Sequence, residues 1–301
     1  MSDLSFCSQL ACSHDVSPAG TATEAAHWLL IEDPSPWGES AVEEADWFPK
    51  VRTALGRWQA AVPDLRVQLI RRELGTWDDP GQIRCFAVRA GGEPVVREWS
   101  LDAYDDLSAL NVPEALSAAS EEDDPDPLVL TCVNGKRDAC CAKWGRPVAQ
   151  AAADAAPNAA WQTSHLGGHR FAPIVLVLPH GTQYGWLRPD DIVDLVAAHQ
   201  QGRLFDLGRI RGRVDQPRPV QAACLSLRSR LDLQGLNAVQ GTVVDESEGR
   251  WTVQVTVDGQ TRTAHVQQNE RAVAFPHSCG SDESKSDVEW AVTWETPNES
   301  D

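Results

Sequence analysis

The sequence predicts an α/β (α+β) protein built from two compact units, and three features of the 301 residues support this class. Apolar runs of strand length alternate with amphipathic segments of helix length. The length and the hydrophobic content of 42% are sufficient for two cores. A charged, proline-containing run at residues 121–127 separates the units, because it cannot bury apolar surface.

The composition therefore divides the chain into five regions. We expect an N-terminal α/β domain at 1–120, an acidic linker at 121–127, a second α/β domain at 128–205, a C-terminal extension at 206–280 and an acidic tail at 281–301. Acidic and small residues dominate the last region, so we expect it to be mostly disordered.

The first domain is expected to contain a strand, a helix and three further strands. The apolar run Trp28–Ile31 predicts the first strand, and Ser40–Ala61 follows a helical pattern. The three later strands are expected at Arg66–Arg71, Arg84–Arg89 and Val95–Trp99. None of these segments contains an obvious functional site.

The second domain shows the order strand, helix, strand, strand, strand, helix. These elements are expected at Pro127–Thr131, Ala142–Ala155, Ala160–Thr163, Ile174–Leu178, Gln183–Leu187 and Pro189–His199. This is the order of a thioredoxin fold, in which the last two strands form a hairpin after a proline. The pattern predicts the order of the elements and leaves their pairing open.

The C-terminal extension is expected to form a helix and a β-hairpin. Apolar residues recur at helical spacing over Pro219–Leu233. The segments Trp251–Val257 and Thr261–Gln267 alternate around Asp258-Gly259, a strong turn signal because both central positions of that tight turn favour positive φ.

Two loops of the second domain, each following a predicted strand, contain pairs of potential metal ligands. One pair is Cys132 with Cys141, and the other is His165 with His169. Thiolates and imidazoles bind zinc and the irons of iron–sulfur clusters, and two loops at one end of a sheet can supply two ligands each. Between the histidines, Gly167-Gly168 disfavours a helix, so we expect a loop curling around an ion.

The residues around these ligands resemble known ferredoxins. The segment Cys141-Ala142-Lys143-Trp144-Gly145 is similar to the second cysteine and helix start of thioredoxin-like ferredoxins. Residues 165–173, His-Leu-Gly-Gly-His-Arg-Phe-Ala-Pro, resemble their second ligand loop, with histidines in place of the two cysteines.

With histidines at these two positions, the sequence resembles the sucrase/ferredoxin-like family. The motif of that family combines the His-x-Gly-Gly-His loop with a second segment, represented here by Cys132, Gly135, Arg137 and Asp138. The likeness extends from Cys7 to about Arg230, but its specific motifs occupy only residues 132–146 and 165–173. It implies a thioredoxin-like ferredoxin domain preceded by a degenerate thioredoxin-like domain.

By this resemblance, Cys132 and Cys141 bind one iron of a 2Fe-2S cluster, and His165 and His169 bind the other. Cys140 is adjacent to Cys141 and remains an alternative, although the following residues favour Cys141. The resemblance implies an electron carrier rather than an enzyme. Replacing two thiolates by neutral imidazoles removes negative charge, so the reduction potential should exceed that of an all-cysteine cluster.

Other functions compete with electron transfer. The same four residues could form a Cys2His2 zinc site in a structural or interaction protein. Thiol redox catalysis would require a Cys-x-x-Cys motif, whereas Cys140 and Cys141 are adjacent. Glycoside hydrolysis requires a positioned carboxylate pair, and nucleotide chemistry a phosphate-binding glycine loop; neither motif is recognisable.

Charge and composition narrow the range of partners. A formal charge of -18 disfavours nucleic acid and anionic lipid, but suits an unidentified redox partner protein with a basic docking face. No run of about 18 apolar residues and no secretory signal is recognisable, so we expect a cytoplasmic protein without membrane attachment. The oligomeric state is not indicated.

Eight cysteines without an export signal are not expected to form a disulfide framework. Away from Cys132, Cys140 and Cys141, they are expected to be buried apolar side chains, except for Cys279, expected as an exposed bystander near the tail. The histidines without a motif, His199, His265 and His277, are expected at the surface.

Overall fold

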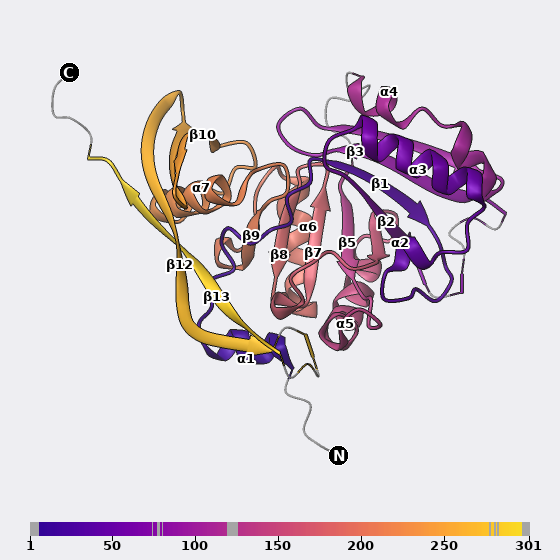
Figure 1. Ribbon diagram of the computed structural model, residues 1–301, viewed down its shortest axis with the longest axis horizontal. Coiled ribbons are helices and arrows are strands. Elements are labelled where there is room, and N and C mark those ends of the chain that lie inside the picture. Colours follow the sequence, from indigo (N-terminus) through magenta and orange to yellow (C-terminus); the bar gives the residue numbers. More distant parts are fainter. Residues whose placement is uncertain are drawn as a thin grey trace, which may run out of the picture.

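The computed structural model describes residues 6–73, 75–76, 79, 81–118, 126–276, 278–279, 281 and 283–296. These residues form a nine-stranded mixed sheet flanked by helices and a separate four-stranded antiparallel sheet (Figure 1). The fold is α+β, which confirms the predicted class. Within the described ranges, no helix has the length and apolar character needed to cross a bilayer.

The first unit is a four-stranded mixed sheet with its one parallel strand pair at the edge that faces the second unit. Its elements are β1 (His27–Glu32), α2 (Ala41–Glu44), α3 (Pro49–Ala61), β2 (Leu65–Arg71), β3 (Ile83–Arg89), β4 (Val95–Leu101) and α4 (Val112–Ser117). Strand β1 is parallel to β2 and antiparallel to β3, and β4 is antiparallel to β3.

The single helix predicted over Ser40–Ala61 is divided into α2 and α3. Pro49 begins α3, and the preceding Phe48 is extended, with φ -59° and ψ 149°. A proline disfavours helical geometry at the residue before it, so the chain bends here.

The second unit contains all six predicted elements. They are β5 (Leu128–Cys132), α5 (Ala139–Ala155), β6 (Ala160–Thr163), β7 (Ile174–Leu178), β8 (Thr182–Gly185) and α6 (Ile192–Gln200). Strand β5 is parallel to β6 and antiparallel to β7, and β8 is antiparallel to β7. This is the thioredoxin arrangement, and it repeats the pairing of the first unit.

The two units join edge to edge into one sheet with the order β4-β3-β1-β2-β6-β5-β7-β8-β9, where β9 is Ile210–Arg213. The joint is antiparallel and covers only two residue pairs, Ile70 with Thr163 and Arg71 with Gln162. It brings the loop after β6 against β2. The predicted linker at 121–127 falls largely on residues 121–125, which lie outside the described residues.

The C-terminal extension packs α7 (Arg218–Leu231) on the four-stranded sheet. The strands are β10 (Gln240–Ser247), β11 (Arg250–Val257), β12 (Gln260–Pro276) and β13 (Ser284–Trp294). The predicted helix and the β11–β12 hairpin are confirmed.

The expectation of a mostly disordered tail is wrong for Ser284–Trp294, because these residues pair with β12 as strand β13. Trp290 and Trp294 pack against the core between α7 and the sheet. Burial of these alternating apolar residues offsets the acidity of the segment. Residues 297–301 lie outside the described residues.

Helix α1 (Cys7–Ser13) and strand β12 come together near the second unit. Helix α1 packs against the short turn η2 (His169–Phe171) and against β12. In Figure 1, α1 lies beneath the long β12–β13 ribbon, on the side of the molecule where α5 begins. This places residues from both ends of the chain beside the predicted ligand loops.

One histidine expected at the surface is buried instead. His199, in α6, is 8% exposed, and its Nε2 lies 2.9 Å from the buried Tyr184 hydroxyl. The helix presents this face to the sheet, and the hydroxyl satisfies the ring nitrogen. His265 is exposed as expected, and His277 lies outside the described residues.

Candidate metal centre

Strand β5 and helix α5 place the two predicted cysteine ligands opposite each other. Every residue of β5 is buried, and Cys132 ends the strand. Asp138 caps α5 by accepting a hydrogen bond from the Cys140 N–H at 2.8 Å. A Cβ on Gly145 would lie 2.1 Å from the Cys132 carbonyl oxygen, so only glycine permits α5 to approach the strand this closely.

The histidine loop is held by hydrogen bonds to the first unit. The Ser164 N–H donates to the Leu69 carbonyl at 2.9 Å, and the Ser164 hydroxyl accepts from the Leu69 N–H at 3.1 Å. The Arg66 guanidinium donates to the His165 carbonyl at 2.8 Å. Gly167 and Gly168 then turn the chain with φ of +88° and +76°, values that glycine adopts without strain.

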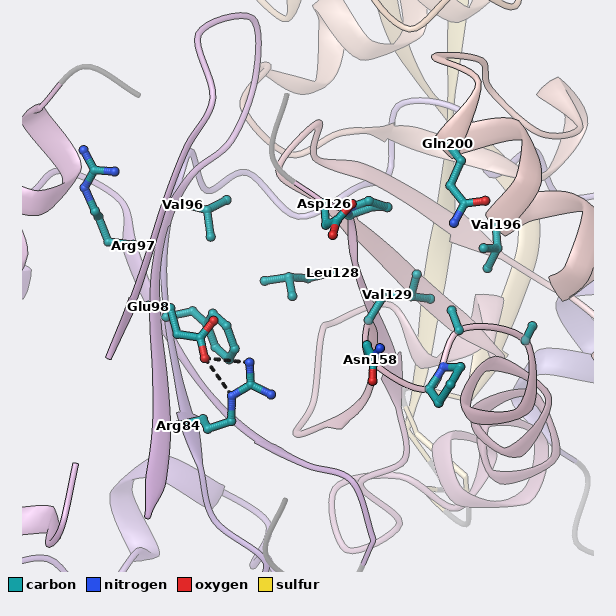
Figure 2. A pocket seen from close by; sticks show the side chains of 16 residues that line it. Arg84, Val96, Arg97, Glu98, Asp126, Leu128, Val129, Asn158, Val196 and Gln200 are labelled. Carbon is teal, nitrogen blue, oxygen red and sulfur yellow. Dashed lines mark hydrogen bonds and ion pairs between the residues drawn. The ribbon is translucent and has the colours of Figure 1, made fainter. Parts of the chain in front are cut away.

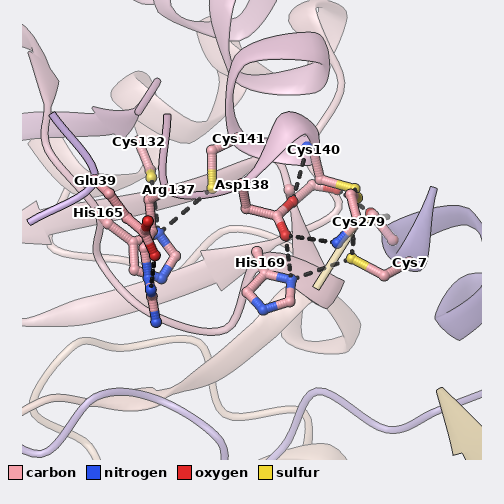
Figure 3. Close-up of polar contacts among 12 residues, drawn as sticks. Cys7, Glu39, Cys132, Arg137, Asp138, Cys140, Cys141, His165, His169 and Cys279 are labelled. Carbon is pink, nitrogen blue, oxygen red and sulfur yellow. Dashed lines mark hydrogen bonds and ion pairs between the residues drawn. The ribbon is translucent and has the colours of Figure 1, made fainter. Parts of the chain in front are cut away.

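Three of the four predicted ligands form one compact group, which we call the first ligand group: Cys132, Cys141 and His165. Their ligand atoms lie within 4.8 Å of one another. The His165 Nδ1 is 3.5 Å from the Cys141 Sγ and 3.9 Å from the Cys132 Sγ (Figure 3). Both cysteines are 1% exposed. Two soft sulfurs and an imidazole at this spacing can bind a metal.

His169, the fourth predicted ligand, lies beside this group without joining it. Its ring centroid is 6.1 Å from that of His165. Its Nδ1 is 3.1 Å from the Asp138 Oδ2 and 3.1 Å from the Cys7 Sγ. A carboxylate at one ring nitrogen is the usual arrangement around a metal-binding histidine, so Nε2 is the atom suited to a metal.

The protonation of the first ligand group is uneven. Hydrogen bonding by the Cys141 thiol and by His165 lowers the pKa of Cys132, although burial opposes this shift. The bond to Cys132, together with burial, raises the pKa of Cys141. These opposite shifts make Cys132 the more easily deprotonated thiol of the two, and the thiolate is the form that binds metals.

A further set of potential ligands, the second ligand group, adjoins the first: Cys7, Asp138, Cys140 and Cys279. The Cys140 and Cys279 sulfurs are 2.9 Å apart, and the Cys7 sulfur is 3.5 Å from each (Figure 3). Cys140 belongs here rather than with Cys132, because successive helical residues point in different directions. Hydrogen bonds from Cys140 and Cys7 lower the pKa of Cys279, and the bond to Cys140 raises that of Cys7.

Sequence reasoning missed the second ligand group. The expectation that Cys279 is an exposed bystander is wrong, because the residue is partly buried and its N–H donates to the Asp138 Oδ2 at 3.0 Å. Cys140 is separated by 133 residues from Cys7 and by 139 from Cys279. No local spacing motif relates these residues; the adjacent cysteines at 140 and 141 were the available signal.

Four arginines, of which Arg211 is buried, lie on the other side of the histidine loop. Arg66, Arg170, Arg211 and Arg218 line a cavity of about 590 Å³ next to His169. Arg211 is 2% exposed and donates to the Gly167 carbonyl at 2.9 Å. Burial lowers the pKa of Arg211 to about 9, which leaves the guanidinium charged at neutral pH. The loop is therefore held by a buried cation.

A larger cleft, of about 770 Å³, lies at the opposite end of β5 (Figure 2). Leu128 at the start of β5 lines this cleft, whereas Cys132 ends the strand at the ligand groups. Its charged side chains include an ion pair between Arg84 and Glu98, with nitrogen and oxygen 2.6 Å apart. Its described lining contains no cysteine or histidine, so it is unrelated to the metal centre.

Comparison with known proteins is consistent with this geometry. Curated proteins and solved structures gave no match. The family model described as Sucrase/ferredoxin-like matches residues 18–212, a segment that contains all four predicted ligands but neither Cys7 nor Cys279. Because this match covers more than half of the chain, the protein belongs to the sucrase/ferredoxin-like family.

Proposed function

We propose that this protein is an electron carrier that binds a 2Fe-2S cluster, with Cys132 and Cys141 on one iron and His165 and His169 on the other. The observation that carries the proposal is the position of the His165 Nδ1, 3.5 Å and 3.9 Å from the two buried sulfurs, with the His169 ring alongside. Thiolates and imidazoles are ligands of the irons in iron–sulfur clusters. Rotation of these side chains can widen the space between them to admit the cluster.

The surrounding residues fit such a cluster, which when bound supplies a one-electron acceptor. Burial of Cys132 and Cys141 excludes water from the sulfurs. Asp138 orients the His169 ring through Nδ1 and leaves Nε2 for the metal. Arg66 and Arg211 place positive charge near Cys132. This charge would stabilise the reduced cluster more than neutral side chains would.

The histidines set the expected direction of the reduction potential. Two neutral imidazoles replace two anionic thiolates, so the reduced centre carries less negative charge. We expect a potential above the roughly -400 mV of plant-type all-cysteine ferredoxins. The electron donor and acceptor would be partner proteins, and the formal charge of -18 suits partners with basic docking faces.

A single zinc ion is the second candidate for the first ligand group. Three donors within 4.8 Å of one another are compact enough to bind one tetrahedral ion, with a fourth position open. Such a site would be structural or catalytic rather than redox-active.

Anaerobically purified protein distinguishes the two candidates. For a 2Fe-2S centre we expect a brown protein with about two irons and two acid-labile sulfides per chain and an EPR signal on reduction. A colourless protein without iron would reject the cluster, and bound zinc that is lost with Cys132→Ser would favour a zinc site in the first ligand group.

Replacement of the histidines tests their role. His165→Cys and His169→Cys should each retain a cluster and lower its midpoint potential, because an anionic ligand replaces a neutral one. The exposed His265 lies in the other sheet, so His265→Cys is the matched control and should leave the potential unchanged. Unchanged potentials in both His165 and His169 variants would mean that neither residue binds the cluster.

A further inference from the structure

The second ligand group joins three distant parts of the chain at one point. Cys7 comes from α1, Asp138 and Cys140 from the start of α5, and Cys279 from the connection between β12 and β13. Cys7 and Cys140 are 0% exposed, and the three sulfurs face one another (Figure 3). The family match begins after Cys7 and ends before Cys279, so it contains only Asp138 and Cys140 of this group.

We propose that Cys7, Cys140 and Cys279 bind a zinc ion, with Asp138 as the fourth ligand, in a structural site separate from the proposed iron–sulfur centre. The inference rests on the second ligand group alone. It does not depend on what the first ligand group binds.

The distances match a tetrahedral site. Two thiolates bound to one zinc at about 2.3 Å lie roughly 3.8 Å apart. The Cys7 sulfur is 3.5 Å from both other sulfurs, and a small outward rotation of Cys279 lengthens the remaining 2.9 Å separation. A carboxylate oxygen of Asp138 lies within 4.8 Å of all three sulfurs. Four donors from three segments can therefore surround one ion.

Backbone dipoles at this point compensate for the negative charge of the ligands. Asp138 and Cys140 lie at the N-terminus of the 17-residue helix α5, where the helix dipole favours anions. The Cys140 and Cys279 N–H groups donate to the two Asp138 oxygens at 2.8 Å and 3.0 Å. These bonds fix the carboxylate. Oδ2 also contacts the His169 Nδ1, so Oδ1, which accepts only the Cys140 N–H, keeps a lone pair for a metal.

A disulfide accounts for the group less well than a metal does. A disulfide would join only two of the sulfurs at about 2.05 Å and would leave the third thiol buried among them. All three sulfur–sulfur distances exceed that bond length. A disulfide would also give no reason for the Asp138 carboxylate to lie beside the sulfurs, whereas a zinc ion would bind all four groups.

A zinc ion here would tie both ends of the chain to the histidine loop. Asp138 also contacts the His169 Nδ1, and α1 packs on η2, which contains His169. The site would therefore hold the His169 ring in place and would link Cys7 to Cys279 through the metal ion. We expect its loss to loosen α1 and the β12–β13 connection before the rest of the fold.

The test measures metals in full-length protein purified without chelator. We expect about one zinc per chain in addition to any iron. Cys279→Ser should reduce zinc to near zero but leave iron and the visible spectrum unchanged, whereas Cys132→Ser should retain zinc. The adjacent pair is the sharpest comparison, because Cys140→Ser should lose zinc and Cys141→Ser should not.

Cys12→Ser is the matched control for Cys7→Ser, because Cys12 lies in the same helix but is exposed and outside the group. Cobalt titration of the metal-depleted wild type adds a direct probe. Three thiolates around Co²⁺ should give strong thiolate-to-cobalt charge transfer and the visible bands of a tetrahedral ion.

Three results would overturn the zinc proposal. One is a wild-type protein that contains no zinc and gives no thiolate–cobalt absorption. Another is a Cys140–Cys279 disulfide in protein alkylated directly from anaerobic lysate. The third is loss of iron with Cys279→Ser and retention with Cys132→Ser, which would also relocate the proposed cluster. Absence of iron in the wild type, with zinc sensitive to Cys279 only, would reject the cluster alone.

Discussion

Gly145 determines how closely α5 approaches the end of β5. Alanine usually stabilises a helix by about 0.5–1 kcal/mol relative to glycine. At this position the added Cβ would meet the Cys132 carbonyl oxygen at 2.1 Å, and a backbone atom cannot rotate away. We expect Gly145→Ala to lower the free energy of unfolding by about 1–3 kcal/mol and to reduce metal occupancy of the first ligand group. Urea unfolding and metal analysis measure both effects.

Gly56→Ala is the matched control for this prediction. Gly56 is also helical, in α3, and nothing lies within 4 Å of the Cβ that alanine would add there. The substitution should therefore stabilise the protein by about 0.5–1 kcal/mol. If Gly145→Ala were equally stabilising, the close approach of α5 to Cys132 would not constrain the site.

Buried His199 predicts a loss of stability in mild acid. Burial lowers its pKa to about 4, whereas the unfolded chain titrates near 6.5. Between these values the unfolded state binds more protons, so stability falls as pH decreases from 6.5 and the loss is complete near pH 4. The pKa of His180 is also lowered by burial and acts in the same direction.

We expect the contribution of His199 to the free energy of unfolding to fall by about 2 kcal/mol as the pH is lowered from 6.5 to 5. His199→Gln keeps a hydrogen-bonding partner for the Tyr184 hydroxyl but does not titrate. Urea unfolding of both proteins at pH 7 and pH 5 should show a smaller loss in the variant. Equal losses would indicate that His199 is protonated in the folded protein.

At the scale of elements, β13 shows how composition can mislead. The segment Ser284–Trp294 is acidic, which predicts a disordered tail, yet its apolar residues alternate at strand spacing. Trp290 packs edge-to-face against Trp251 with ring centroids 5.4 Å apart, and its indole N–H donates to the Gly20 carbonyl at 2.9 Å. The partner strand and α7 supply the burial that the segment cannot provide alone.

Deletion of residues 284–301 should therefore expose the second sheet. We expect faster hydrogen exchange in β12 and a red-shifted emission from Trp251, which loses its ring partner. Deletion of 297–301 alone is the control and should change neither signal. Unchanged exchange in the longer deletion would mean that β13 does not stabilise the sheet.

The elements that local patterns predicted best are those with strong periodicity or turn signals. The six elements of the second unit and the hairpin at Asp258-Gly259 follow from such patterns. The division of the first helix before Pro49 was not predicted, because the helical periodicity continues past this proline. Strand β9 was missed because Ile210–Arg213 is short and contains two arginines and a glycine.

At the scale of the whole molecule, local sequence motifs predicted one of the two ligand groups but not the other. The first ligand group follows from two short motifs, so Cys132, Cys141 and His165 could be placed together from sequence. Cys7 and Cys279 meet Cys140 because α1 and the connection between β12 and β13 both lie beside the start of α5, and no local sequence spacing indicates this. The joint between the units was likewise invisible, because it depends on two residue pairs and the Ser164 hydrogen bonds.

That joint predicts that both units unfold together. The nine strands form one sheet, and the ligand loop is hydrogen-bonded across the joint, so neither unit keeps its edge paired when the other unfolds. We expect far-UV circular dichroism and tryptophan fluorescence to report a single coincident transition in urea. Two separated transitions in the wild type would show that the units are independent.

Ser164→Ala probes the same joint directly. The buried hydroxyl accepts from the Leu69 N–H at 3.1 Å and donates to the Gln68 Oε1 at 2.6 Å, so its removal leaves a buried donor and a buried acceptor unpaired. We expect a loss of about 1–3 kcal/mol in the free energy of unfolding and weaker metal retention at His165. Ser117→Ala removes an exposed hydroxyl bond in α4 and should cost less than about 0.5 kcal/mol. Equal effects of the two substitutions would exclude the joint as a support of the site.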